Sequence, residues 1–179
     1  MQITGGKLNS RKIKTEKFKN IKPTLSKTRQ GIFNSLSSII DFEGKSFLDM
    51  FSGSGIMALE AYSRGFEPVY AIELDKKTAL SAKEIFSDLK TSCKLFIGDS
   101  LRVSKKLGMI FDVIFIDPPY ESDLYDKALK AIKEANIISP NGIIIMEHPN
   151  SKQIDITGFC VVKVKDYGDV SITFLKKDD

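Results

Sequence analysis

From residue 46 onward, short apolar runs alternate with longer segments in which apolar residues recur at helical spacing. The runs, which predict strands, are "SFLDM", "VYAIE", "KLFI", "DVIFID" and "GIIIME". The segments between them, such as "KKTALSAKEIFSDLK" and "ESDLYDKALKAIKEA", predict helices. This alternation is typical of an α/β fold in which helices cover both faces of a parallel sheet.

Both ends of the chain depart from this alternation. "FCVVKVKD" and "VSITFLK" flank a short turn at residues 167–169 and predict an antiparallel hairpin that closes a mostly parallel, seven-stranded sheet. "LSKTRQGIFNSLSSII" predicts a helix ahead of the first parallel strand. Farther upstream, "MQITGGKLNSRKIKT" alternates around a Gly-Gly pair and predicts a small basic hairpin. We therefore divide the chain into a basic N-terminal arm, residues 1–24, and one domain, residues 25–179.

The composition favours a soluble protein with reduced thiols. A chain of 179 residues can bury a substantial core without disulfides. Cys93 and Cys160 are far apart and accompany a single histidine, His148, so we expect no metal site. The N-terminus has no apolar segment of a signal peptide, and no stretch approaches eighteen apolar residues. We expect a cytoplasmic protein that has no membrane contact and acts as a monomer.

Positive charge is concentrated near the N-terminus. Residues 1–45 hold ten Lys or Arg and three acidic residues, whereas residues 46–179 hold 17 basic and 20 acidic residues. A basic end on a slightly acidic body is typical of an arm that binds a polyanion, although a solvated surface would show the same charge pattern.

The segment "LDMFSGSGIMALEA" predicts a glycine-rich turn, between a strand and a helix, that binds a nucleotide-like ligand. A strand ends at Asp49, and Gly53-Ser54-Gly55 allows the backbone to turn tightly and approach a ligand before a helix begins. Glu73 ends the next strand, 20 positions after Gly53, where a carboxylate can accept both hydroxyl groups of a ribose. The arrangement predicts a cofactor that contains adenosine.

Asp49 favours S-adenosylmethionine over a nicotinamide dinucleotide. A carboxylate just before the turn would repel a pyrophosphate, whereas it would attract the cationic amino-acid end of S-adenosylmethionine. After the third strand, Asp99 in "GDS" could accept the amine of the cofactor's adenine or could equally cap the next helix.

The fourth strand runs into "DPPY", Asp117 to Tyr120. Two consecutive prolines remove two backbone donors and keep the preceding residues extended, so the segment presents mainly acceptors. The Asp117 carboxylate and the Pro118 carbonyl could therefore accept both hydrogens of an exocyclic amine, and the Tyr120 ring could stack on the base that carries it. Such a base would have to be flipped out or unpaired. A rigid turn at the end of a strand is the simpler alternative.

Together these motifs resemble a known family. The glycine turn with "DPPY" is similar to that of class I amino-methyltransferases, which have a Rossmann-like fold. More narrowly, "GGKLNSRKI", "KPTLSKTRQGIFNSL", "DMFSGSGIMALEAYSRG", "AIELD" and "FIDPPY" resemble the bacterial 16S rRNA guanine-N2 methyltransferases that modify guanine 966. The resemblance extends from about residue 5 to residue 175.

The resemblance implies a set of site residues. Cofactor contacts are expected from Asp49, Gly53, Gly55, Glu73 and Asp99, to which we add their neighbours Phe51, Leu74 and Ser100. Recognition of the amine is expected from Asp117, Pro118, Pro119 and Tyr120. RNA contacts are expected from Lys7, Arg11, Lys12, Lys14, Lys22, Thr24 and Arg29. Lys22, Ser26 and Lys27 stand where the family often has Arg, an acid and Arg, and lysine lacks the bidentate geometry of arginine.

The implied function is methyl transfer from S-adenosylmethionine to the N2 amine of a guanine in 16S rRNA, with naked RNA or an assembling small subunit as the substrate. Adenine-N6 methylation of DNA or RNA is the nearest alternative, because "DPPY" alone does not distinguish the two amines. A non-catalytic RNA-binding assembly factor and an NAD-dependent dehydrogenase are alternatives of other classes. A small enzyme without a large base-recognition domain is better suited to a folded target such as a ribosomal subunit.

Overall fold

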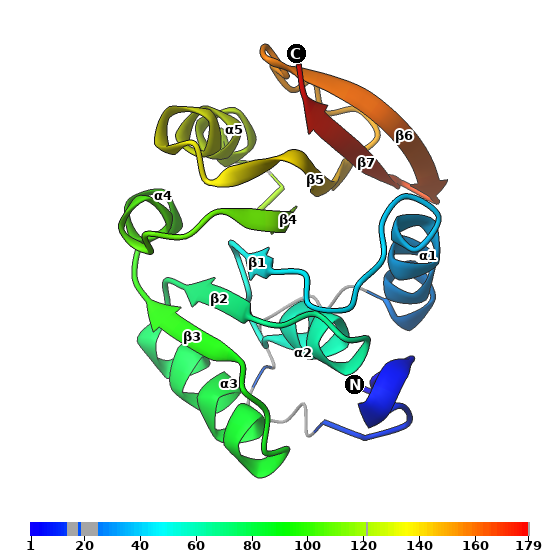
Figure 1. Cartoon of the computed structure of the whole chain (residues 1–179), viewed down its shortest axis with the longest axis vertical. Coiled ribbons are helices and arrows are strands. Elements are labelled where there is room, and N and C mark those ends of the chain that lie inside the picture. The colour runs from blue at the N-terminus through cyan, green and yellow to red at the C-terminus, as the bar shows by residue number, and fades with distance from the viewer. Residues whose placement is uncertain (14–17, 19–24, 121, 179) are drawn as a thin grey trace.

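The computed structural model describes residues 1–13, 18, 25–120 and 122–178. Within these residues, seven strands form one sheet in the order β3-β2-β1-β4-β5-β7-β6 (Figure 1). The strands are β1 (Phe47–Asp49), β2 (Val69–Glu73), β3 (Lys94–Ile97), β4 (Phe111–Ile116), β5 (Ile138–Pro149), β6 (Phe159–Tyr167) and β7 (Val170–Lys177). Strands β1 to β5 pair in parallel, and β7 runs antiparallel to both β5 and β6. The predicted mostly parallel sheet with a C-terminal antiparallel hairpin is confirmed.

Helices cover both faces of the sheet, as predicted. They are α1 (Ser26–Leu36), α2 (Ile56–Ser63), α3 (Lys76–Asp88), α4 (Ser100–Val103) and α5 (Leu124–Ala135), with the short 3-10 turns η1 (Gly6–Leu8) and η3 (Ser104–Lys106). Residues of α1, α2 and α3 form one hydrophobic cluster with one face of the sheet, and residues of α4 and α5 form a second cluster with the other face (Figure 1).

Burial on both faces explains why the central strands β1 and β4 are apolar at nearly every position. Successive strand residues point to opposite faces, so Phe115 belongs to the cluster of α1 to α3 and Ile116 to the cluster of α5. Phe47 and Leu48 divide in the same way. A sheet with one solvated face would instead show alternating polar positions.

The described part of the N-terminal arm pairs with itself in antiparallel fashion. Gln2 and Lys12 form a β-bridge, and the Ile3 amide donates to the Arg11 carbonyl at 3.0 Å. Ile3 and Ile13 are buried in the same cluster as α2, so the hairpin shares the core of the domain. The predicted boundary at residue 24 lies outside the described residues, and the division into arm and domain stays a prediction.

The cysteine, histidine and acidic side chains of the described residues form neither a disulfide nor a metal cluster. Among the described residues, no helix is long and apolar enough to cross a bilayer, and no three His, Cys, Asp or Glu side chains gather around a possible metal position. Cys93 and Cys160 are free thiols. Burial raises the pKa of Cys93 to about 12, so its thiol stays protonated and unreactive at neutral pH.

Candidate active site

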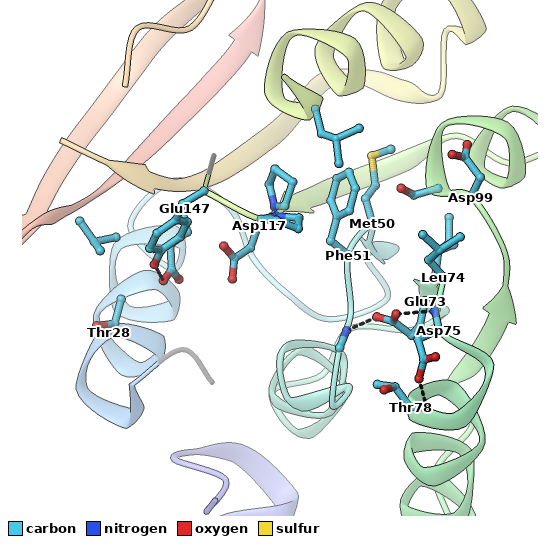
Figure 2. Close-up of a pocket in the computed structure, with 18 of the residues that line it drawn as sticks. Thr28, Met50, Phe51, Glu73, Leu74, Asp75, Thr78, Asp99, Asp117 and Glu147 are labelled. Carbon is cyan, nitrogen blue, oxygen red and sulfur yellow. Dashed lines mark hydrogen bonds between the residues drawn. The ribbon is translucent and has the colours of Figure 1, made fainter. Parts of the chain in front are cut away.

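A cavity of about 650 Å³ opens at the edge of the sheet where the parallel strands end. Loops that follow β1, β2, β3 and β4 form its wall, which is the usual position for a ligand in an open parallel sheet. Figure 2 shows two halves with Phe51 and Met50 between them. The labelled side chains of one half are Glu73, Leu74, Asp75, Thr78 and Asp99, and those of the other are Thr28, Asp117 and Glu147.

The first half is organised by Glu73. Its Oε2 accepts from the Gly53 amide at 2.7 Å and its Oε1 accepts from the Asp75 amide at 2.8 Å (Figure 2). These bonds fix the carboxylate at the cavity wall, and each oxygen retains a lone pair for a ligand hydroxyl. Gly53 has a φ of +50°, in the left-handed region that favours glycine. The structure therefore brings Gly53 and Glu73 together, as the sequence predicts.

Gly55 has a structural role at the start of α2. Its φ is +76°, and a Cβ at this position would lie 2.7 Å from the Phe86 ring of α3. The glycine thus allows α2 and α3 to pack closely behind the turn. The cavity wall includes Gly53 and does not include Gly55, so direct cofactor contact by Gly55 stays a prediction.

Asp49 is buried beneath the glycine turn and does not line the cavity. It is 1% exposed, and neither carboxylate oxygen has a hydrogen-bond partner. Burial, with a smaller contribution from the nearby Glu73 carboxylate, raises the pKa of Asp49 to about 7; the Phe51 and Ala58 amides are near enough to oppose this rise in part, but neither reaches hydrogen-bond geometry. A buried carboxylate without a partner is costly, and a cationic ligand group at the turn would reduce that cost.

Asp99 has one of the two roles that the sequence left open, the helix cap, while its contact with the adenine amine stays a prediction. Its Oδ1 accepts from the Arg102 amide at 2.9 Å and caps α4, while the residue also lines the cavity. Ser100 lies beside it in the wall. Leu74 is 71% exposed and, with Phe51, gives this half an apolar surface that suits a flat ring such as adenine.

The second half contains the whole "DPPY" segment. Asp117, Pro118, Pro119 and Tyr120 all line the cavity. The Pro118 carbonyl, predicted to lack a donor from its own segment, receives the hydroxyl of Tyr125 at the long distance of 3.5 Å. Tyr125, buried in α5, also donates to the Glu147 carbonyl at 3.2 Å, so Pro118 retains acceptor capacity toward the cavity.

Sequence reasoning missed Glu147. This residue near the end of β5 is 5% exposed, lines the cavity, and accepts from the Tyr120 hydroxyl at 3.4 Å through Oε1. Burial and the charges of Glu147 and Asp117 raise the pKa of Tyr120 far above its usual range, so the phenol stays neutral. The signal was present in "MEHPN", because an acid at the end of a parallel strand is the same pattern that identified Glu73 and Asp117.

Two elements far apart in the sequence close the second half. Leu25, just before α1, and Thr28 of α1 line the cavity, and so do Tyr167 at the end of β6 and Val170 at the start of β7. The contact between the two elements depends on Gly31, because a Cβ there would overlap the Tyr167 hydroxyl.

The structure gives Arg29 a role different from the expected RNA contact. Its side chain is 1% exposed, pairs with Glu60 Oε1 at 3.3 Å and donates to the Gln2 carbonyl at 2.6 Å. The Thr4 amide also donates to Glu60, at 2.7 Å. This network connects the hairpin to α1 and α2. It also supplies the buried guanidinium with the opposite charge and the hydrogen-bond acceptors that burial requires.

The other expected RNA contacts lie on the hairpin or outside the described residues. Lys7, Arg11 and Lys12 are exposed. The Lys7 ammonium lies 3.6 Å from the centre of the Tyr62 ring of α2. Lys14, Lys22 and Thr24 fall outside the described residues, so nothing tests their predicted role.

Comparison with known proteins supports the family suggested by the motifs. The family model described as "Conserved hypothetical protein 95" matches residues 1–176. Ribosomal RNA small subunit methyltransferase D of Buchnera aphidicola subsp. Acyrthosiphon pisum is 32% identical over 154 residues, which cover 85% of this chain and 80% of that protein.

Two solved structures share the fold. The crystal structure of the putative methylase HI0767 from Haemophilus influenzae has a TM-score of 0.81 and 30% identity, over 99% of this chain and 98% of that one. An RNA methyltransferase from Salinibacter ruber, solved with S-adenosyl-L-homocysteine, has a TM-score of 0.69 and 13% identity, over 88% and 95% of the two chains. The chain therefore belongs to the "Conserved hypothetical protein 95" family, together with ribosomal RNA small subunit methyltransferase D, and is a methyltransferase with the class I fold.

Proposed function

We propose that the protein transfers a methyl group from S-adenosylmethionine to the N2 amine of a guanine in 16S rRNA. The observation that carries this proposal is the single cavity in which Gly53 and Glu73 occupy one half and Asp117 to Tyr120 the other. The name of the Buchnera relative supports small-subunit rRNA as the substrate. We further propose that the protein acts in the cytoplasm, as a monomer, on RNA of an assembling subunit.

The residues of the first half fit S-adenosylmethionine. Glu73 offers acceptors to ribose hydroxyls, Asp99 offers them to the adenine amine, and the apolar surface of Phe51 and Leu74 can hold the adenine ring. The partnerless Asp49 carboxylate beneath the turn supplies negative potential for the cationic end. When bound, this cofactor supplies a methyl group on a sulfonium sulfur, which needs no further activation.

The residues of the second half orient the accepting amine. The Asp117 carboxylate and the Pro118 carbonyl accept its two hydrogens, which fixes the nitrogen and localises its lone pair toward the first half. Tyr120, neutral and held by Glu147, provides a ring face for the base. Asp117 can then take up the proton that the methylated nitrogen releases. Positioning accounts for most of the remaining rate enhancement.

The exposed cations of the hairpin give RNA a binding surface beside the cavity. The Ser54 hydroxyl in the glycine turn lies 3.7 Å from the Met1 sulfur, so the hairpin begins next to the turn. Arg11 and Lys12 are exposed on this hairpin, and the Lys7 ammonium, on an exposed residue, lies over the Tyr62 ring of α2. Phosphate binding by such residues weakens steeply as the salt concentration rises.

Labelled cofactor tests the proposal directly. The purified protein is incubated with S-adenosylmethionine carrying a labelled methyl group and with unmodified small ribosomal subunits or naked 16S rRNA, and the labelled nucleoside is identified by mass spectrometry. We expect N2-methylguanosine at one position. N6-methyladenosine would support the alternative acceptor, and the absence of label in both substrates would contradict rRNA methylation. The Asp117→Ala variant provides the inactive control.

A further inference from the structure

Glu147 lies next to Asp117 across two neighbouring strands. Ile116 of β4 and Met146 of β5 are register partners in a parallel pair. The residue that follows each partner is therefore its neighbour at the same edge, where adjacent strands are about 4.8 Å apart. Because Ile116 and Met146 both point toward α5, the side chains of Asp117 and Glu147 both point to the opposite face, which α1 covers. Figure 2 shows both carboxylates in the half of the cavity that contains Thr28.

The surroundings of Glu147 hold its carboxylate in place. It is 5% exposed, and its Oε1 accepts from the Tyr120 hydroxyl at 3.4 Å. On another side lies Arg29, whose pKa is lowered by burial while the charges of Glu60 and Glu147 oppose that change. Its Oε2 is buried, so Oε1 is the oxygen that a base in the cavity would approach, and one carboxylate oxygen can accept a second hydrogen bond beside the one from Tyr120. The second half of the cavity thus presents two adjacent carboxylates to a base.

Two adjacent acceptors match the hydrogen-bonding edge of guanine. Guanine carries the N1–H donor beside its 2-amino group, so its edge presents a row of donors. Adenine carries its 6-amino group beside N1, which is an acceptor. An ionised carboxylate has no hydrogen to offer, and it would face a lone pair if adenine occupied the site. Asp117 and Pro118 alone would accept either amine.

We propose that Glu147 accepts the N1–H of the target guanine while Asp117 and Pro118 hold its 2-amino group, and that this contact selects guanine over adenine. The inference rests on the proposed guanine-N2 methylation and supplies the base specificity that the "DPPY" motif lacks. A buried acceptor of the enzyme discriminates strongly against a base that lacks the matching donor. The hydrogen bond made with the correct base is then lost, and no water replaces it.

A base analogue tests the contact. 2-Aminopurine has the same 2-amino group as guanine, but its N1 has a lone pair and no hydrogen. We compare kcat/KM for 16S rRNA carrying guanine or 2-aminopurine at the methylated position, with the wild type and with the Glu147→Gln variant. The wild type should prefer guanine by about 100-fold. The ratio should fall below about tenfold in the variant, because a carboxamide can turn to donate to N1 or to accept from it.

The Tyr120→Phe variant separates two possible roles of Glu147: recognition of the guanine N1–H, and positioning of the Tyr120 ring through its hydroxyl. It removes the hydroxyl that contacts Glu147 and leaves the carboxylate in place, so it should lower kcat/KM for both RNAs and keep the wild-type ratio. Equal use of the two bases by the wild type, or the same ratio in wild type and Glu147→Gln, would overturn the assignment. Calorimetric binding of S-adenosylmethionine shows that each variant is folded.

The failure of this inference differs from the failure of the proposed function. If the wild type methylates guanine at N2 and the ratio does not depend on Glu147, only the inference falls. If the wild type leaves the guanine RNA unmethylated, the proposed function falls and the inference falls with it.

Discussion

Replacing Asp49 by Asn should stabilise the protein at alkaline pH and weaken cofactor binding. The carboxylate is 1% exposed without a hydrogen-bond partner, and burial raises its pKa from 3.8 to about 7. Because the pKa is higher in the folded state than in the unfolded state, the folded protein binds the proton more tightly. The free energy of unfolding therefore falls as the pH rises from about 4 to about 7, and the full cost persists above pH 7.

The size of this effect follows from the shift. About three pKa units correspond to about 4 kcal/mol, as an upper bound that structural relaxation would reduce. Between pH 5 and pH 7 the stability of the wild type should decrease relative to Asp49→Asn by up to about 1.4 kcal/mol per pH unit. Above pH 7 the difference between the two proteins should become constant.

Urea unfolding from pH 5 to pH 9, without cofactor, measures the difference, and Asp88→Asn serves as the control. Asp88 is an exposed residue of α3, and its replacement changes the net charge equally. Calorimetry at pH 8 should show about tenfold weaker S-adenosylmethionine binding to Asp49→Asn, with a smaller difference at pH 5.5, where the wild-type carboxyl is mostly protonated. A stability difference that does not change with pH would refute the account of Asp49 as a costly buried charge.

Three further variants test other parts of the site. Asp117→Ala should abolish methyl transfer and leave S-adenosylmethionine affinity within about tenfold in calorimetry, because Asp117 lies in the amine-binding half; undiminished turnover would remove it from the mechanism. Replacing Arg11 and Lys12 by Gln should weaken RNA binding and lower the slope of log K against log salt by about 1 to 2, and an unchanged slope would mean that the arm is only a solvated surface. Gly31→Ala should displace Tyr167, since the new Cβ would overlap its hydroxyl; we expect a higher KM for RNA with unchanged cofactor affinity, and an unchanged KM would exclude this wall from the RNA site.

The local sequence pattern was sufficient to predict most of the sheet and about half of the candidate site. Strands buried on both faces are apolar at nearly every position, and the helices between them show helical spacing, so the parallel sheet follows from the sequence. Because parallel strands end at one edge, the positions of Glu73 and Asp117 at a common cavity follow from the strand pattern alone. The same rule, applied to the fifth strand, would have identified Glu147.

Contacts between distant segments depend on packing, and the sequence did not predict them. Arg29 and Glu60 are 31 positions apart, and only the packing of α1 against α2 shows that they form a buried pair. The burial of Asp49 beneath the turn has the same origin, because a strand-ending acid is equally compatible with a cavity wall.

By itself the sequence determined the α/β class, the edge that carries the site and the acceptor chemistry of "DPPY", since these depend on periodicity and on side chains adjacent along the chain. Only the tertiary structure decided which side chains share the cavity. It placed Glu147 beside Asp117 through the β4–β5 register, and it brought α1 against the turn between β6 and β7. Strand register and helix packing depend on the burial of many residues that are distant in the sequence. A short segment of the sequence therefore does not predict them.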